Sequence, residues 1–506
     1  MNRLFYGDNL EVLRRFVRDE SVDLVYIDPP FNSKRNYNQI YNNVGKEDLA
    51  QVQAFVDTWE WNLRADAGFK EVVGNYNGVF TAQSIELIIG FERVLGRGTL
   101  LAYLVSVTLR LVEVWRVLKP TGSFYLHCDP TASHYLKLVC DAIFVAGRGG
   151  EFQNELIWCY SIGGKSKKRF GEKHDVIFYY TKCKDDLHKF DKLGAKIPRK
   201  ANSHMKAGTD ADGREFQEKK DKKTGKVYRY YLDEGKIAED YWIDIEALNY
   251  EDKERLGYPT QKPERLLERI IKTSSNEGDV VMDCYCGCGT AVAVAQRLGR
   301  QWIGVDITFQ SISLILRRLE FSFGKEVLKE VQLSGIPKDL ESAVALAKKE
   351  DDRLRKEFEK WVILTFSNNL ALVNDKKGGD GGIDGLCFVG DLDEKGAQAY
   401  KRVLFSVKSN KMLSPSVVRD LNGAMEREGA VMGFLLTLYR FENLEKESGK
   451  YGSYDNQQFG KSFKRIEVVC VEDIMGGRRL DLPISIEVLK KAESKVKGKQ
   501  GELGEG

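Results

Sequence analysis

The chain lacks any long apolar run and any large excess of one charge. Its most hydrophobic stretch, residues 100–118, contains Arg110, Glu113 and Arg116. That stretch therefore predicts a buried or amphipathic helix and no membrane span. Met1 to Glu20 mixes charged and apolar residues, which is not the pattern of a secretory signal. The formal net charge is only +3, so the overall charge balance does not by itself point to a nucleic-acid partner.

The sequence also lacks the even number of cysteines that is typical of a disulfide framework. The nine cysteines are an odd number in a chain without a signal segment. This favours a reducing cytoplasm over a disulfide framework, so we expect a cytoplasmic protein without a membrane partner. At 506 residues with 42% apolar content, the chain can form two to four domains with ordinary cores.

The most informative stretch lies near the start of the chain. Val22 to Ile27 is a short apolar run rich in β-branched residues, which predicts a buried strand. Asp28-Pro29-Pro30-Phe31 follows it directly. Each proline fixes its own φ and restricts the residue before it, so the strand ends in a stiff corner that carries an acid. Ligands bind at this end of the strands in an open α/β sheet.

A basic region follows this first block. Residues 161–230 contain 20 Lys and Arg against 10 Asp and Glu. Lysine and arginine contacts to phosphate give sequence-independent affinity for nucleic acid. The alternative interpretation of this region is a solvated insertion without a partner. We favour DNA contact, with these candidates at its start: Lys165, Lys167, Lys168 and Arg169.

A second block carries the pattern of a nucleotide-binding βαβ unit. A predicted strand ends at Asp283, a turn contains Gly287 and Gly289, and a helix follows. The next predicted strand ends at Asp306, where a carboxylate can accept hydrogen bonds from ribose hydroxyls. Three alternating cysteines at 284, 286 and 288 suggest a metal site, but no second pair stands at a familiar zinc spacing. Small side chains around a tight turn are the favoured explanation.

Together, the two blocks resemble the S-adenosylmethionine-dependent DNA amino-methyltransferases. Asp28-Pro29-Pro30-Phe31 is similar to their catalytic motif, and the segment from Asp283 to Thr290 is similar to their cofactor turn, with Cys284, Tyr285 and Cys288 as departures. The catalytic motif precedes the cofactor turn, which is the permuted order of the β group. The resemblance implies a Rossmann-like methyltransferase sheet of the α/β class. It also implies catalytic roles for Asp28, Pro29, Pro30 and Phe31, and cofactor-binding roles for Asp8, Lys262, Asp283, Gly287, Gly289, Thr290 and Asp306. For Asp8, capping of the following helix is an equal alternative.

The function implied is methyl transfer from S-adenosyl-L-methionine to the N6 amine of adenine in double-stranded DNA, by base flipping and within a restriction–modification system. Aspartate at the first motif position favours adenine. The alternatives are N4-cytosine methylation, methylation of RNA or of a protein amide, and a DNA-binding protein without catalysis.

The last third resembles the Mrr-like branch of the PD-(D/E)xK nucleases. Gly382-Ile383-Asp384-Gly385 precedes a predicted strand that ends at Lys408, and Glu359 lies on a predicted helix. The resemblance implies Mg²⁺ binding by Asp384 and charge stabilisation by Lys408. Ser406 stands where the family has an acid or glutamine. The alternatives are an active nuclease, a nuclease fold kept for DNA binding, and an unrelated α/β domain.

These patterns predict six segments. The oligomeric state stays open, with a homodimer among the expectations. We expect a catalytic part at 1–160, a basic target-recognition region at 161–255, a cofactor-binding part at 256–325, a helical linker at 326–356, a nuclease-like domain at 357–490 and a flexible tail at 491–506.

Overall fold

A nine-stranded sheet forms the first part of the molecule in the computed structural model. The structure describes residues 2–30, 36–40, 51–56, 61–161, 168, 170–184, 187–199, 205–249, 252–256, 258, 260–337, 340–348, 352–367, 371–374, 382–392, 396 and 398–482. The strand order is β13-β6-β7-β5-β2-β14-β15-β1-β16, and only β7 runs antiparallel to its neighbours. The strands are β1 (Asn2–Tyr6), β2 (Val22–Ile27), β5 (Leu118–Cys128), β6 (Glu151–Cys159), β7 (His174–Thr181), β13 (Tyr241–Trp242), β14 (Val280–Asp283), β15 (Gln301–Asp306) and β16 (Val331–Ser334).

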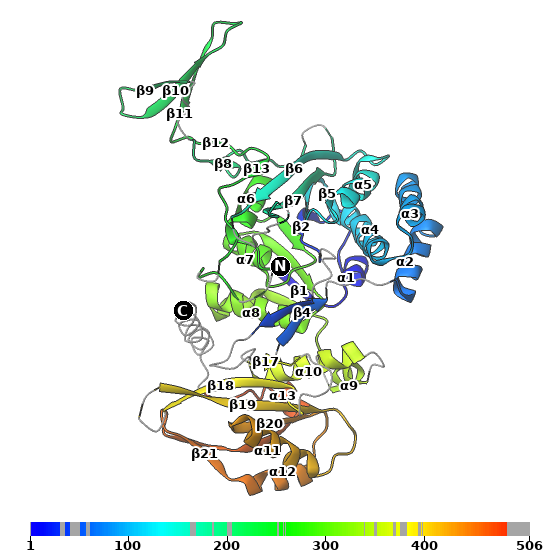
Figure 1. Cartoon of the computed structure of the whole chain (residues 1–506), viewed down its shortest axis with the longest axis vertical. Coiled ribbons are helices and arrows are strands. Elements are labelled where there is room, and N and C mark those ends of the chain that lie inside the picture. The colour runs from blue at the N-terminus through cyan, green and yellow to red at the C-terminus, as the bar shows by residue number, and fades with distance from the viewer. Residues whose placement is uncertain are drawn as a thin grey trace.

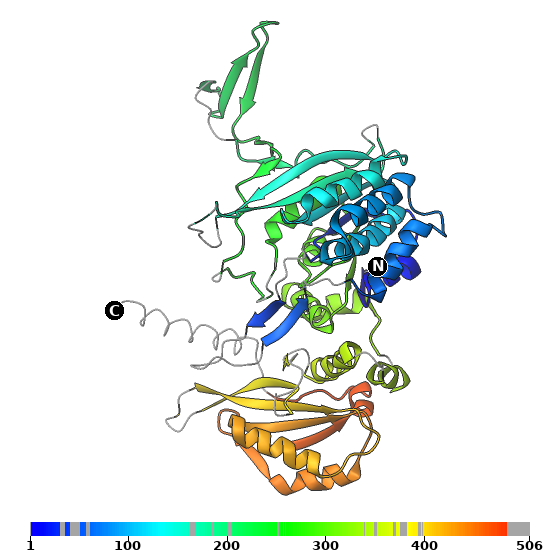
Figure 2. The same cartoon turned by 45° about the vertical axis from the view of Figure 1, so that its right-hand side comes forward.

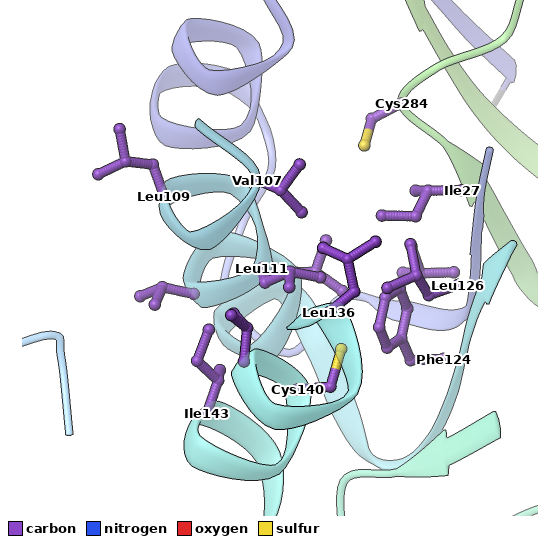
Figure 3. Packing of buried hydrophobic residues seen from close by; sticks show 14 of the residues in the cluster. Ile27, Val107, Leu109, Leu111, Phe124, Leu126, Leu136, Cys140, Ile143 and Cys284 are labelled. Carbon is purple, nitrogen blue, oxygen red and sulfur yellow. The ribbon is translucent and has the colours of Figure 1, made fainter. Parts of the chain in front are cut away.

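Helices cover both faces of this sheet (Figure 1). Alternate residues of each strand point to opposite faces, so Val25 and Ile27 of β2 join one core while Leu24 and Tyr26 join the other. Figure 3 shows the first core, where Ile27, Phe124 and Leu126 of the sheet pack near helical side chains such as Leu111 and Leu136. The first face carries α1 (Asn9–Phe16), α2 (Leu63–Gly74), α3 (Ala82–Leu95), α4 (Thr99–Val117) and α5 (Ser133–Cys140) with the π-turn Asp141–Val145, and the second carries α6 (Glu264–Ser274), α7 (Thr290–Arg297) and α8 (Phe309–Phe323).

The neighbouring strands β2 and β14 form a topological switch point. From β14 the chain passes through α7 to β15 on one side, whereas from β2 it continues to β5 on the other side. Loops that leave two adjacent parallel strands in opposite directions open a crevice at their carboxyl ends. Asp28 and the turn after Asp283 both lie at this edge.

One sequence expectation needs correction. Before the segment that it concerns, β3 (Asn36–Ile40) pairs with β4 (Gln51–Val56), and α3 ends where Gly96 adopts φ +67°. The linker expected at 326–356 is not wholly helical. After the 3-10 turn Lys325–Glu330, β16 pairs with the free edge of β1, because an edge strand offers unpaired backbone groups.

A second, five-stranded sheet forms the C-terminal part, in the order β17-β18-β19-β20-β23. Residues from α8, α9 and α10 pack into its core, including Phe309 and Trp361. The elements are α9 (Leu340–Ala347), α10 (Asp352–Phe366), β17 (Leu372–Val373), β18 (Gly385–Leu392), β19 (Gln398–Lys408), α11 (Ser416–Glu428), β20 (Ala430–Thr437), α12 (Glu442–Ser448), the 3-10 turn Gly449–Tyr451, β21 (Ser453–Asn456), β22 (Lys461–Lys464), β23 (Ile466–Cys470) and α13 (Val471–Met475).

A slender arm extends from the opposite end of the molecule (Figures 1 and 2). Its three antiparallel strands are β9 (Lys206–Thr209), β10 (Glu215–Lys220) and β11 (Val227–Tyr231). The paired strands β8 (Lys196–Ile197) and β12 (Lys236–Ile237) connect it to the body. Across the residues described, no helix is long and apolar enough to cross a membrane.

Candidate active site

Asp28 lies directly after β2, at the switch point of the large sheet. Its Oδ2 atom accepts a hydrogen bond of 2.7 Å from Nζ of Lys262, which precedes α6. Both side chains are mostly buried, with 17% of Asp28 and 10% of Lys262 exposed. The second oxygen, Oδ1, is buried and has no hydrogen-bond partner among the described residues. A buried acceptor without a donor is costly, so this atom is suited to a donor supplied by a ligand.

The proline corner holds this carboxylate in place. Pro29 is buried and Pro30 is half-buried, directly after the last hydrogen-bonded residues of β2. Phe31, the fourth predicted catalytic residue, lies outside the described residues.

The turn from Asp283 to Thr290 faces this corner from the end of β14. Gly289 adopts φ +74°, and a Cβ atom built there would lie 2.6 Å from Cγ1 of Ile315 in α8. Gly287 adopts φ +50°, and its Cβ would lie 3.0 Å from Cε1 of Tyr258. Both positions therefore require glycine for conformation and for space.

Thr290 begins α7 and is buried. Its hydroxyl accepts a hydrogen bond of 3.1 Å from Nη1 of Arg318, whose Nη2 donates to Oε1 of Glu264 at 2.6 Å. This buried arginine joins α6, α7 and α8 around the turn. The sequence pattern did not single out Arg318, because its partners are 28 and 54 residues away.

Asp306 and Asp283 place two further carboxyl groups at the same edge. Oδ2 of Asp306 accepts the Gly287 N–H at 2.9 Å, and Oδ1 accepts the Thr308 N–H at 2.9 Å. Burial raises the pKa of Asp306. Burial, together with the charges of Asp28 and Asp306, raises the pKa of Asp283 to about 8. Oδ1 also accepts the Thr308 hydroxyl at 3.1 Å, so Oδ2 is the Asp306 oxygen better placed to accept a ribose hydroxyl.

Asp8 serves as the N-cap of α1. Its Oδ1 accepts the Leu10 N–H at 2.9 Å, and its Oδ2 lies 3.2 Å from Nη2 of Arg110. The capping alternative therefore describes its observed contacts, and no contact of Asp8 with the glycine turn is seen in the described part of the chain. Its neighbour Asn9 instead donates to the backbone oxygen of Cys284 at 2.8 Å.

A buried polar chain runs beside Asp28 along the ends of β2, β5 and β7. Nε2 of His127 lies 2.9 Å from Oδ2 of Asp175, and Nδ1 lies 2.8 Å from the Tyr26 hydroxyl. Ionised Asp175 can only accept, so Nε2 of His127 donates to it. Burial alone would raise the pKa of Asp175, but the hydrogen bond and the electrostatic effect of His127, followed by the charge of Lys262, hold that pKa below its usual value. These contacts suit a structural role for His127.

The three alternating cysteines pack into the fold. Cys284, Cys286 and Cys288 are buried free thiols, as are the other cysteines at buried positions, and none of the nine forms a disulfide. Cys286 lies against Gly304, where an added Cβ would be 2.9 Å from its sulfur. Within the described ranges, no group of three or more His, Cys, Asp or Glu side chains is arranged to hold a metal ion.

The predicted nuclease residues lie just before β18, at the end of β19 and on α10. Asp384 Oδ2 accepts the Val407 N–H at 2.7 Å, and Lys408 closes the same strand. Burial and the charge of Asp384 raise the pKa of Glu359, while Lys356 and Lys408 act in the opposite direction. Lys356, which the sequence pattern missed, donates to Glu359 Oε2 at 2.6 Å and lies 3.8 Å from Asp384 Oδ1.

Of the four predicted DNA-binding residues, only Lys168 falls among the described residues, where it is exposed. Lys165, Lys167 and Arg169 lie outside them.

The two folds and their sites define a class: an α/β group-transfer enzyme of the methyltransferase type with a second α/β domain. The DNA methylase family model matches residues 22–317, and the restriction endonuclease model matches residues 354–451. The chain therefore belongs to the N6/N4 DNA methylase family and carries a restriction endonuclease domain at its C-terminal end. It is a DNA methyltransferase of the restriction–modification type, and DNA is its substrate.

Two curated relatives illustrate the similarity. DNA adenine methyltransferase YhdJ of Escherichia coli K12 is 26% identical over 332 residues, which cover 65% of this chain and 87% of that protein. Type II methyltransferase M.HpaI of Haemophilus parainfluenzae is 29% identical over 238 residues, covering 46% of this chain and 65% of that protein. Among solved structures, the cytosine-N4-specific PvuII DNA methyltransferase aligns with 65% of this chain and 91% of its own, at 17% identity and a TM-score of 0.38.

Proposed function

We propose that this protein transfers a methyl group from S-adenosylmethionine to the N6 amine of adenine in duplex DNA. The observation that carries the proposal is the hydrogen bonding of the two Asp28 carboxylate oxygens. Lys262 donates to one of its oxygens, whereas the other is buried at the switch point of the sheet and receives no hydrogen bond from the residues that the structure describes.

The chemistry explains why an acid in a rigid corner is useful. The lone pair of the adenine amine is delocalised into the ring, so the amine is a poor nucleophile. Asp28 Oδ1 and the carbonyl of Pro29 would accept the two amine hydrogens and draw the lone pair onto nitrogen. Because the prolines fix both acceptors before the substrate arrives, little reorganisation is needed. Phe31 would stack on the base after it leaves the duplex.

S-adenosylmethionine would supply the methyl group from the neighbouring crevice. The left-handed backbone of Gly287 and Gly289 shapes the turn beside that crevice, and Oδ2 of Asp306 can accept a ribose hydroxyl. These features fit the ligand. Thr290 and Asp8 would then act mainly through the elements that they hold in place.

Adenine is preferred over cytosine because an aspartate stands first in the Asp28-Pro29-Pro30 corner. N4-cytosine methylation is the second candidate, since the same acceptors serve any planar exocyclic amine. Both candidates act on DNA.

The first test is Asp28→Ala. We expect methyl transfer to be abolished while S-adenosylmethionine still binds, because Asp28 contacts the amine and not the glycine turn. Transfer of labelled methyl groups to DNA measures the first effect, and calorimetry measures the second. Full activity of the variant would remove the assignment. Expression in a methylation-deficient host, followed by sequencing that detects modified bases, distinguishes N6-adenine from N4-cytosine.

A second activity, DNA cleavage by the C-terminal domain, is favoured by the convergence of Glu359, Asp384 and Lys408. Asp384 and Glu359 offer the oxygen ligands that Mg²⁺ prefers, and Mg²⁺ would polarise the phosphate. We expect Mg²⁺-dependent cleavage that Lys408→Ala abolishes, whereas Lys411→Ala, on an exposed residue just beyond the strand, leaves it intact. Absence of cleavage by the unaltered protein under all metal conditions would refute this activity.

A further inference from the structure

The end of the arm is a cluster of lysines, here called the lysine tip. Lys219, Lys220, Lys222, Lys223 and Lys226 surround the turn between β10 and β11, and all five are exposed. The one acid among residues 219–226 is Asp221. Its Oδ1 accepts the N–H groups of Lys223 and Thr224, both at 2.8 Å, so Asp221 shapes the turn.

The arginines of the arm that lie nearer the body form ion pairs with acids. Arg214 pairs with Asp233 at 2.8 Å, and Arg229 pairs with Glu218 at 2.8 Å. No ion pair joins any of the five tip lysines to an acid in the described part of the chain. Five like charges around one turn repel each other, and a polyanion would relieve that repulsion.

The arm also has a firm, if small, packing centre. The ring of Phe216 lies under Gly208, where an added Cβ would be 2.7 Å from Cζ. The guanidinium of Arg229 covers the same ring, 3.9 Å from its centroid. These contacts pack the three strands against each other, so the lysine tip is carried by an ordered sheet.

The position of the arm indicates which part of a duplex it would meet. Figures 1 and 2 show it standing clear of the body beyond β6 and β13. The six residues of β10 span roughly 20 Å, more than half a helical turn of DNA. The lysine tip would thus reach DNA that flanks the target site.

We propose that the arm is a phosphate clamp, which grips the backbone of duplex DNA outside the target sequence. Lysine is a point charge suited to phosphate and carries little base information. The clamp would raise affinity for DNA of any sequence without changing the chosen site. This inference rests on the proposed action on duplex DNA, but its test does not depend on methyl transfer.

The test compares K220Q/K222Q/K223Q with a control, K325Q/K329Q/K348Q, which removes the same charge from exposed lysines elsewhere. Both are titrated with random-sequence duplexes of one and three helical turns at several salt concentrations. The logarithm of the association constant falls with the logarithm of salt, with a slope of about 0.9 per phosphate contact. On the long duplex, we expect the salt slope of the tip variant to be smaller than that of the unaltered protein by up to about 2.7. The slope of the control should be unchanged.

Two further readouts complete the experiment. The rate of methyl transfer at saturating DNA and the methylated sequence should be the same in the tip variant as in the unaltered protein. An unchanged salt slope, or an altered target sequence, would overturn the clamp. If no variant methylates DNA, the proposed methyltransferase function fails, while the salt slope still reports on the arm. Circular dichroism confirms that the tip variant is folded.

Discussion

At the scale of residues, the Lys262–Asp28 ion pair links the two halves of the site. The two residues are 234 positions apart, and their charged atoms lie 2.7 Å apart. Lys262 had been expected to bind the cofactor. Its observed partner suggests instead that it orients the carboxylate, so that Oδ1 is presented to the substrate.

Lys262→Met tests the two roles. If Lys262 orients Asp28, the rate of methyl transfer should fall by about tenfold or more while the Kd of S-adenosylmethionine changes little. If it binds the cofactor, the Kd should rise instead. Lys272→Met is the matched control, because Lys272 lies on the following helix and pairs with Glu268.

Asp283 predicts a pH dependence of stability. Its pKa is about 8 in the folded protein and about 3.9 in an unfolded chain. Between these values the folded protein retains a proton that the unfolded chain releases, so the stabilising contribution is full below about pH 4 and is lost as the pH rises to about 8.

Asp283→Asn is neutral throughout this range and should lack the effect. We expect its free energy of unfolding, relative to that of the unaltered protein, to rise by up to roughly 1 kcal/mol per pH unit between about pH 5 and pH 8. Urea denaturation at several pH values measures the difference. A difference independent of pH would show that Asp283 is ionised in the fold.

At the scale of elements, the glycine turn is fixed by its packing against α8. Gly289→Ala should destabilise the protein by about 2 to 4 kcal/mol, because it combines a left-handed backbone with a clash against Ile315. Gly278→Ala is the control, since Gly278 has φ +81° but open space around it, and should cost about 1 to 2 kcal/mol. Adding Ile315→Ala to Gly289→Ala should remove part of the clash, and thermal denaturation compares all three variants.

The strands around the site were largely predictable from the sequence, whereas the strand at the edge of the sheet was not. The apolar run of β2 and the acids at the ends of β14 and β15 are local patterns, and the strands lie where those patterns indicated. The strand β16 was missed because its stability comes from β1, more than 300 residues earlier. Pairing with a distant edge leaves little signal in a short polar segment.

At the scale of the whole molecule, Glu357 connects the two domains. It lies on α10, two residues before Glu359, and its Oε2 accepts the Tyr6 hydroxyl at 3.0 Å and the Phe309 N–H at 3.1 Å. Burial and the charge of Glu357 raise the pKa of Tyr6, so its hydroxyl stays protonated and continues to donate. Tyr6 ends β1, and Phe309 begins α8 just after Asp306.

Glu357→Ala should therefore weaken the coupling between the domains. In the unaltered protein, an analogue of S-adenosylmethionine should raise the melting temperature of both domains. In the variant, we expect two separate transitions, of which the analogue raises only the first. Differential scanning calorimetry measures both, and a single shared transition in the variant would contradict the coupling role.

The sequence by itself determined the chemistry that each strand end carries, because short apolar runs, prolines and glycines act on their own neighbourhood. It singled out Asp28, the glycine turn and Asp306, as well as Asp384 and Lys408, as candidate site residues. Only the tertiary structure decided which of these meet. Lys262 reaches Asp28, Arg318 binds the turn and Glu357 joins the domains because the order of strands in the sheet brings distant segments together. Such partners depend on packing across hundreds of residues, which no local pattern encodes.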